Sequence, residues 1–249
     1  MNKFFKLLIL SNTLFFATQA IAQTKKKVEL KKNIAAKTPI KKVVTKSYPQ
    51  KKIVDNSIKI KISTDSGVIV VKLYDSTPLH RDNFAKLVKE GFYDSLIFHR
   101  VISNFMIQGG DPNSKHSEPG AMLGNGGGDM ARIPAEFKPN LYHKKGTLCA
   151  ARDNNPEKAS SACQFYIVQG KPYTDDELNG MEMQSGKKFT AEARLAYKTI
   201  GGTPFLDQNY TVFGEVIKGL NVIDKIASTP KGMADRPVGD IRMKMEITK

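Results

Sequence analysis

The sequence predicts an α+β fold or a helix-capped β-barrel, and two observations carry this prediction. Residues 58–62 alternate isoleucine with lysine, residues 65–67 form an Asp-Ser-Gly turn, and residues 68–73 are again mostly apolar. Alternation beside such a turn is typical of a β-hairpin. Pro78 then begins a stretch with apolar residues at helical spacing that ends near Gly91, which predicts one amphipathic helix. Strands followed by a helix favour these two fold classes.

Composition and charge narrow the class of protein. The chain has 249 residues, 40% of them hydrophobic, which excludes a fully disordered or collagen-like chain and suits one large domain or two small ones. Residues 1–22 contribute +2 and residues 23–56 contribute +9 to the formal charge of +15, so the remainder carries only +4. We therefore expect a mildly basic folded domain over residues 57–249.

Residues 1–22 are typical of a signal peptide. Lys3 and Lys6 precede an apolar stretch over residues 7–17, and Ala20-Ile21-Ala22 has the A-x-A form of a cleavage site. We expect the mature chain to begin at Gln23 and to be exported, to a periplasm or to the medium. The alternative, an uncleaved membrane anchor, is disfavoured because the apolar stretch is short and interrupted.

Residues 23–56 are predicted to be a disordered, Lys-rich linker. They contain 11 lysines and no glycine, and they show neither helical nor strand periodicity. A solvated spacer is the favoured interpretation, and the alternative is a weak, salt-sensitive contact with a polyanion or a membrane surface. Tyr48 is the only aromatic residue available to stack on bases, so no specific nucleic-acid binding is expected.

One segment of the sequence, residues 98–112, is a highly specific motif because of its length and its unusual composition. Residues 98–112 read FHRVISNFMIQGGDP, with an arginine and a glutamine among apolar residues. This segment resembles the F-H-R-V-x-x-x-F-M-x-Q-G-G-D signature of the cyclophilin family of peptidyl-prolyl isomerases. Similar segments follow at residues 146–152, 161–167, 205–216 and 219–226, so that the resemblance covers residues 57–249.

The resemblance implies a mainly β fold, namely a closed eight-stranded antiparallel barrel capped by two helices. It also implies that the chain accelerates rotation about X-Pro bonds, acts on proline-containing polypeptides and needs no cofactor. Rotation about such a bond is slow because amide resonance opposes it by about 18–20 kcal/mol. Catalysis requires only that the twisted state, in which the prolyl nitrogen accepts a hydrogen bond, is stabilised more than the ground state.

The candidate site residues follow from the matching positions. Arg100 is the expected catalytic residue because its guanidinium stays protonated and offers a rigid set of donors. The resemblance assigns Gln108 to the catalytic groove beside it. The residues it assigns to the proline slot are Phe105, Met106, Tyr166, Leu206 and Phe213, and two further substrate-binding positions of the pocket are Phe205 and Tyr210, the latter near its floor. It implies that Ala151 and Arg152 contact the residue before proline, and that Gln164, with Gln108, bonds the substrate backbone. Two alternatives stay open: the aromatic residues as plain core, and the two glutamines as structural groups inside the barrel.

Four positions depart from the usual family pattern. Phe205 stands where many members carry Trp, and Tyr210 stands where many carry His. The resemblance links the indole N–H to cyclosporin binding, so we expect isomerisation with only weak cyclosporin binding. Arg152 replaces the usual Asn and Tyr166 the usual Phe, which predicts a shifted substrate preference.

Residues 171–203 form an insertion that compact family members lack. Thr174 and Glu177 have the spacing of a capping box, and residues 191–198 are strongly helix-forming, so one or two surface helices are expected. The insertion is either a tolerated loop or an arm that contacts substrates or partners. The glycine-rich residues 124–128 lack the features of a phosphate-binding loop and are interpreted as a plain loop.

The cysteines and histidines do not suggest a metal centre. The four histidines have no metal-ligand spacing with each other or with cysteine, so no metal is predicted, and His99 is interpreted as a packing and hydrogen-bonding residue. The resemblance places Cys149 and Cys163 on neighbouring strands. A disulfide between them and two buried free thiols are both open.

These features together predict an exported prolyl isomerase that assists protein folding outside the cytoplasm. Two alternatives belong to other classes of protein. One is a non-catalytic module or holdase that binds proline-containing peptides without turning them over. The other is a polyanion-binding protein that acts through residues 23–56.

Overall fold

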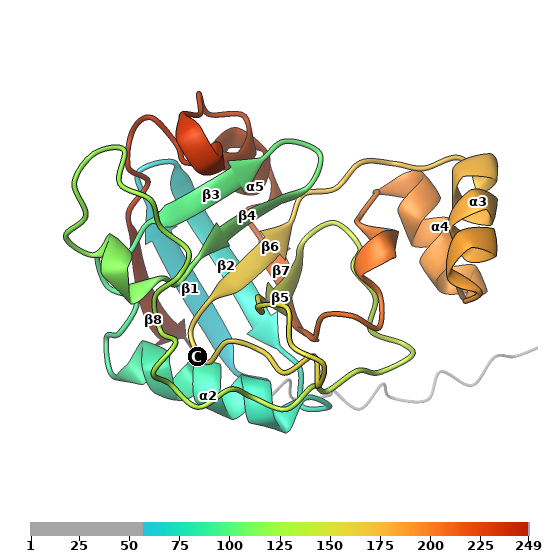
Figure 1. Cartoon of the computed structure of the whole chain (residues 1–249), viewed down its shortest axis with the longest axis horizontal. Helices are drawn as coiled ribbons and strands as arrows, with labels where there is room; N and C mark the ends of the chain where they lie inside the picture. The colour runs from blue at the N-terminus through green and yellow to red at the C-terminus, as the bar shows by residue number, and fades with distance from the viewer. Residues whose placement is uncertain (1–56, 249) are drawn as a thin grey trace, which may run out of the picture. The chain divides into compact units, whose positions relative to one another are not determined.

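The computed structural model describes residues 57–248, so the signal peptide and linker predictions lie outside it (Figure 1). The described strands are β1 Lys59–Thr64, β2 Gly67–Leu73, β3 Phe98–Ile102, β4 Met106–Gly109, β5 Thr147–Ala150, β6 Phe165–Val168, β7 Val212–Lys218 and β8 Met243–Thr248. The α-helices are α2 Pro78–Lys89, α3 Asp175–Ser185, α4 Ala191–Thr199 and α5 Leu220–Ala227. Short 3-10 turns are η1 Pro112–Ser114, η2 Pro204–Leu206 and η3 Met233–Asp235. Within residues 57–248, no helix is long and apolar enough to span a membrane.

The strands form one antiparallel sheet in the order β3-β4-β6-β5-β7-β2-β1-β8. The sheet curls so that its two ends approach, but β3 and β8 do not pair along their length. Phe98 N donates to Ile241 O at 3.0 Å and Met243 N donates to Leu96 O at 2.8 Å, so only the segments at the starts of these strands meet. The expected closed barrel is therefore wrong: the sheet is a curled half-barrel.

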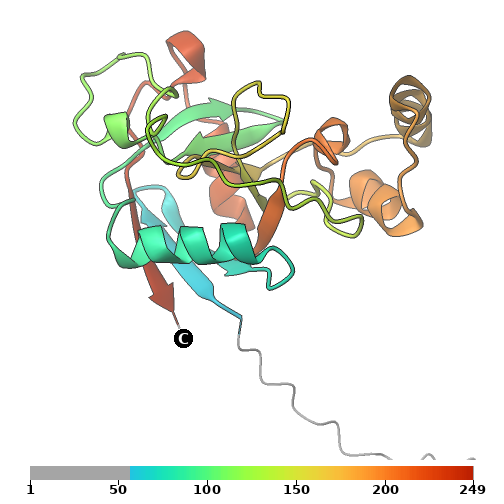
Figure 2. The same cartoon turned by 60° about the horizontal axis from the view of Figure 1, so that its bottom comes forward.

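The predicted hairpin and first helix are confirmed. Ile62 pairs with Ile69 and Ile60 pairs with Val71 across β1 and β2, and all four side chains are buried. Helix α2 begins at Pro78, where proline loses no helical hydrogen bond, and it buries one apolar stripe on the sheet. Figure 2 shows α2 lying across one side of the strands.

The two faces of the sheet have different environments because successive strand residues point to opposite sides. Phe165 faces the main core with Ile107 and Ile167, whereas Tyr166 belongs to a smaller apolar cluster on the outer face. Phe213 was expected in the proline slot, and this expectation is wrong. Its ring lies in the main core, with its centroid 5.3 Å from that of Phe84, because its neighbour Val212 takes the outward position on β7.

Four α-helices are present among the described residues, and two of them lie in the insertion, where one or two surface helices were expected. Helices α2 and α5 pack on the strands, and α3 and α4 form the insertion at one side of the sheet (Figures 1 and 2). The Thr174–Glu177 capping box at the start of α3 is confirmed. The insertion has its own apolar cluster of Tyr173, Leu178, Ala193 and Tyr197, with Tyr142, Met181 and Phe189 packed against it.

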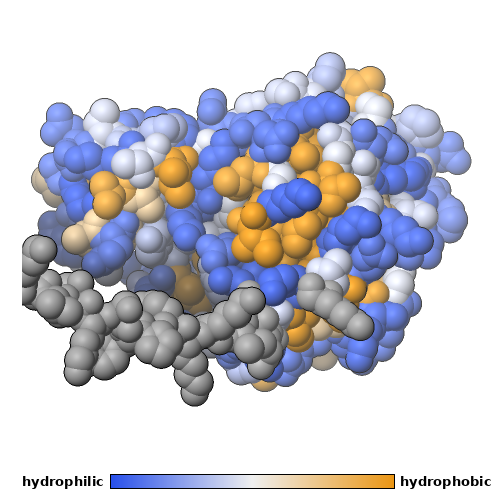
Figure 3. Space-filling view, turned by 180° about the vertical axis from the view of Figure 1, so that it is seen from behind, coloured by the Kyte–Doolittle hydropathy of each residue, from blue (hydrophilic) through white to orange (hydrophobic). Residues whose placement is uncertain are grey.

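Exposed hydrophobic residues do not by themselves mark a functional site on this molecule. Figure 3 shows an apolar area, in orange, on the side turned away from the viewer of Figure 1. Large apolar side chains such as Val68, Ile217 and Leu220 are at least 39% exposed, on β2, β7 and α5. The candidate site differs from these exposed apolar side chains because it lies at a hollow in the outer face of the sheet.

Candidate active site

A row of side chains crosses the outer face of four neighbouring strands. Arg100 of β3 pairs with Gln108 of β4, Gln108 pairs with Tyr166 of β6, and Tyr166 pairs with Cys149 of β5. Residues that pair directly across antiparallel strands project to the same side. The register therefore brings a cation, an amide and an aromatic ring together from segments that are distant in the sequence.

Beside this row lies a hollow of about 360 Å³, which we call the candidate pocket. The sequence-predicted residues in its wall are Arg100, Phe105, Met106, Gln108, Ala151, Arg152, Tyr166, Leu206 and Tyr210. Residues that sequence reasoning missed come from two loops and from β3: Ala121, Leu123, Gly124, Asn125, Ala234, Asp235, Arg236 and His99. The loop residues carry no periodic signal; only the glycine run at residues 124–128 marks the first loop in the sequence.

Arg100 is held at the edge of the candidate pocket. Its Nη1 donates to Gln108 Oε1 at 3.4 Å, its Nε lies 3.8 Å from Asp235 Oδ2, and its Cζ lies 6.0 Å from the centroid of the Phe105 ring. The side chain is 41% exposed. Within the part of the chain that the structure describes, these contacts leave guanidinium N–H groups available to a bound peptide.

Gln164 lies next to the candidate pocket and is fully engaged within the protein. Its Nε2 donates to the carbonyl oxygens of Gly124 and Gly126, both at 2.9 Å, and its Oε1 accepts from Gln108 Nε2 at 3.2 Å. The structural alternative is thus supported for Gln164, which the candidate pocket does not include. Through Gln108, the same chain of amides reaches Arg100 and orients its guanidinium.

Tyr166 is supported from behind by a buried histidine. Its hydroxyl lies 3.0 Å from His143 Nε2, and His143 Nδ1 lies 2.8 Å from Asp207 Oδ1. Burial disfavours the imidazolium, but the interactions with Cys149 and with the Asp207 carboxylate outweigh burial and raise the pKa of His143 to about 9. Sequence reasoning gave no role to His143 or Asp207.

Arg152 and Tyr210 pack against each other. The Arg152 Cζ lies 4.7 Å from the centroid of the Tyr210 ring, a cation–π geometry, and its Nε donates to Asn209 O at 2.9 Å. The two departures from the family pattern are therefore coupled, and together they form one end of the candidate pocket.

His99 lies in the wall of the candidate pocket but makes no hydrogen bond there. Its side chain is buried, and neither ring nitrogen has a partner among the described residues, contrary to the expected hydrogen-bonding role. Burial lowers the pKa of His99 to about 4, so the ring is neutral near pH 7. A neutral, buried ring is a packing group here.

The two cysteines are both buried free thiols. Burial raises the pKa of the Cys163 thiol. The disulfide alternative is therefore not adopted in the structure. Over residues 57–248, no cluster of three or more His, Cys, Asp or Glu side chains has the arrangement of a metal site.

Comparison with known proteins agrees with this geometry. Residues 59–247 match the model of the cyclophilin type peptidyl-prolyl cis-trans isomerase family. The chain belongs to this family. Among curated cyclophilin relatives, a Staphylococcus haemolyticus protein named as a peptidyl-prolyl cis-trans isomerase is 36% identical over 185 residues, which is 74% of this chain and 87% of the relative. A protein of the same name from Staphylococcus aureus strain USA300 is 35% identical, over 88% of its length.

Solved structures show the same cyclophilin fold. A cyclophilin type isomerase of Cryptosporidium parvum superposes with a TM-score of 0.58 at 24% identity, over 78% of this chain and 98% of that chain. The same parasite protein, crystallised in the presence of the dipeptide Ala-Pro, gives a TM-score of 0.55 at 24% identity, over 77% and 99%. The family match and the curated relatives together identify this cyclophilin as a peptidyl-prolyl cis-trans isomerase.

Proposed function

We propose that this isomerase lowers the barrier to X-Pro rotation by using Arg100 to stabilise the twisted imide. One observation carries the proposal: the partly exposed guanidinium stands at the edge of the candidate pocket, whose wall includes Phe105, Met106 and Leu206, and it contacts Gln108 and Asp235. In the twisted state the prolyl nitrogen loses its resonance and accepts a hydrogen bond, which a fixed, charged donor strengthens. This interaction is weaker in the planar ground state, so it accelerates the reaction.

The apolar wall holds the proline ring while the peptide on its N-terminal side turns. Phe105, Met106 and Leu206 supply this wall, and Tyr166 closes its floor. Ala151 and Arg152 lie at one end, where they would contact the residue before proline. Rotation about the X-Pro bond transfers no proton, so the proposed mechanism requires no acid or base.

We also propose that the isomerase works outside the cytoplasm on exported polypeptides. The basic, apolar and A-x-A parts of residues 1–22 support export, and the lysines of residues 23–56 support a weak, salt-sensitive contact with polyanions or a membrane surface. The mass of the protein recovered from the cell envelope or medium tests the first point: export predicts a chain that begins at Gln23, and a full-length chain in the cytoplasm would contradict it.

Exchange NMR on an Ala-Pro-containing peptide tests the mechanism. The full chain should accelerate cis/trans exchange, and Arg100→Ala should lower kcat by about 100-fold or more, as expected when a fixed transition-state donor is removed. The matched control is Arg81→Ala, because Arg81 lies on α2 with Asp75 and Asp82 as partners and outside the candidate pocket. Equal exchange in both variants would refute the role of Arg100.

A further inference from the structure

A second hollow lies between the insertion and the η2 turn, and we call it the second groove. Its volume is about 590 Å³, against about 360 Å³ for the candidate pocket. Its apolar wall is made by Tyr142, Met181, Phe189, Ala193, Pro204 and Phe205. No function derived so far uses this space.

The second groove adjoins the candidate pocket. Phe205 and Leu206 are consecutive residues of η2, and Phe205 lines the second groove whereas Leu206 lines the candidate pocket. Phe205 is 52% exposed, and its ring lies 5.8 Å, centroid to centroid, from that of Phe105 in the pocket wall. Each further residue of an extended peptide adds about 3.3–3.6 Å of reach, so one polypeptide can occupy both hollows by crossing η2.

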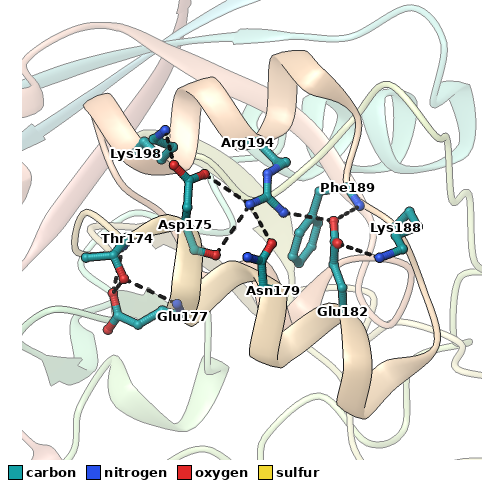
Figure 4. A network of polar contacts seen from close by, with 9 residues as sticks. All are labelled: Thr174, Asp175, Glu177, Asn179, Glu182, Lys188, Phe189, Arg194 and Lys198. Carbon is teal, nitrogen blue, oxygen red and sulfur yellow. Dashed lines mark hydrogen bonds and ion pairs between the residues drawn. The ribbon is translucent and has the colours of Figure 1, made fainter. Parts of the chain in front are cut away.

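The far wall of the second groove is held rigidly by polar contacts (Figure 4). Glu182 on α3, whose side chain is 6% exposed, accepts from Lys188 at 2.9 Å, from Phe189 N at 2.9 Å and from Arg194 on α4 at 3.1 Å. Arg194 also pairs with Asp175 at 3.0 Å, across the two helices. The loop that carries Phe189 is therefore fixed before any ligand binds, which reduces the entropic cost of binding.

The insertion is also tied to the floor of the candidate pocket. Tyr197 on α4 donates its hydroxyl to Asp207 Oδ2 at 2.6 Å, and Asp207 Oδ1 accepts from His143 N at 2.9 Å. His143 in turn contacts the Tyr166 hydroxyl. The two hollows thus keep a fixed spacing, as two parts of one binding surface require.

Two lysines and one carboxylate, Asp207, line the second groove, and Asp207 is already bonded to His143 and Tyr197. Gly186 ends α3 in the left-handed region, with φ of 68°, and the chain then turns so that Lys187 and Lys188 line the groove. Lys188 is neutralised by Glu182, whereas no carboxylate pairs with Lys187 within residues 57–248. An apolar wall with an unneutralised ammonium group at its rim complements an apolar side chain beside an acidic one.

We propose that the second groove is a substrate subsite that binds an apolar residue with an acidic neighbour, on the same polypeptide whose proline occupies the candidate pocket. This proposal rests on the proposed function, because the proline is what brings the polypeptide to η2. It makes the insertion a specificity element of the isomerase.

Exchange NMR over a series of peptide concentrations tests the subsite with three peptides. One is a short Ala-Pro peptide, and the other two carry a Leu-Glu extension several residues to the N-terminal or the C-terminal side of the proline. We expect the full chain to have a KM about tenfold lower for one extended peptide than for the short one. Burying a leucine side chain in the groove improves the binding affinity by about this factor. The extended peptide with the gain identifies the flank that enters the groove.

Two pairs of variants separate the subsite from the catalytic reaction. Met181→Ala should abolish the gain, and Met183→Ala, which truncates a side chain that is 84% exposed outside the groove, should keep it. Lys187→Glu should make the protein prefer a fourth peptide, which carries Leu-Lys in place of Leu-Glu on the same flank, whereas Lys218→Glu on β7 should not. All four variants should turn over the short peptide like the parent.

The outcomes are distinguishable. If the short peptide is not isomerised, the proposed function fails. If the short peptide is isomerised but neither extension lowers KM, or if Lys187→Glu keeps the preference for glutamate, the subsite proposal is wrong and the insertion is a tolerated surface addition. Because Lys187 is exposed, its substitution should not disturb the fold.

Discussion

The hydroxyl of Tyr166 lies 3.0 Å from Nε2 of His143, and both side chains are buried. Their rings are nearly parallel, at 11°, with centroids 6.2 Å apart. Tyr166 faces the candidate pocket, whereas His143 lies behind it and bonds to Asp207. A pocket floor that usually carries phenylalanine in this family is thus joined to a buried polar network.

Tyr166→Phe should destabilise the protein without abolishing isomerisation. The change leaves His143 Nε2 buried without a partner, which costs about 1–3 kcal/mol, whereas the ring that forms the pocket floor is kept. Denaturant unfolding of the parent and the variant measures the difference. Tyr210→Phe is the control: its hydroxyl is partly exposed and makes no hydrogen bond among residues 57–248, so stability should change by less than about 0.5 kcal/mol.

The stability of the protein should fall as pH rises from about 6.5 to about 9. His143 has its pKa raised from 6.5 to about 9 in the folded chain. Over this window the folded state holds a proton that the unfolded state has lost, so unfolding becomes easier as pH increases, by about 3 kcal/mol in total for a shift of this size. Below this window both states are protonated and the contribution is fully present.

Denaturant unfolding at several pH values, on the parent and on His143→Asn, tests this dependence. The asparagine cannot be protonated, so the variant should lose this part of the pH dependence while being less stable at neutral pH. An identical slope in both proteins would mean that His143 is neutral in the folded state.

The sequence predicted the elements that carry local signals. Alternation identified the β1–β2 hairpin, the capping box identified the start of α3, and strand periodicity placed Phe165 inside and Tyr166 outside. It failed where the outcome depends on distant partners. The side of β7 on which Phe213 lies depends on register with β2 and β5, and the opening between β3 and β8 depends on where residues 241–243 meet the other end of the sheet.

The candidate site shows the same division. The motif at residues 98–112 identified Arg100 and Gln108, but nothing local indicates that His143, Asp207 and Tyr197 converge behind Tyr166. These residues come from a loop, the η2 segment and the insertion, and only tertiary structure brings them together. The function of Gln164 was similarly undetermined until its partners were known.

Gln164→Leu should loosen the loop over residues 124–128. The substitution removes both N–H donors that bond the carbonyl groups of Gly124 and Gly126, and it removes the acceptor for Gln108. Amide hydrogen exchange should become faster in this loop and remain unchanged in β1 and β2, which serve as the internal control. Unchanged protection of residues 124–128 would show that other contacts hold the loop. We also expect KM to rise, because the loop forms part of the pocket wall.

Phe205→Trp should increase cyclosporin affinity. We propose weak cyclosporin binding by the parent because phenylalanine has no N–H donor at a position where many family members carry tryptophan. The Phe205 side chain is 52% exposed, so a larger ring fits without displacing the core. A gained hydrogen bond of about 1 kcal/mol, with the added ring contact, should improve the affinity by about tenfold or more.

Since the parent has no tryptophan, the fluorescence of the introduced ring reports binding directly. Inhibition of peptide isomerisation by cyclosporin compares the parent, Phe205→Trp and Phe205→Leu. If Phe205→Trp binds no better than the parent, then Tyr210 or the Arg152–Tyr210 pair, rather than the missing donor, limits cyclosporin binding.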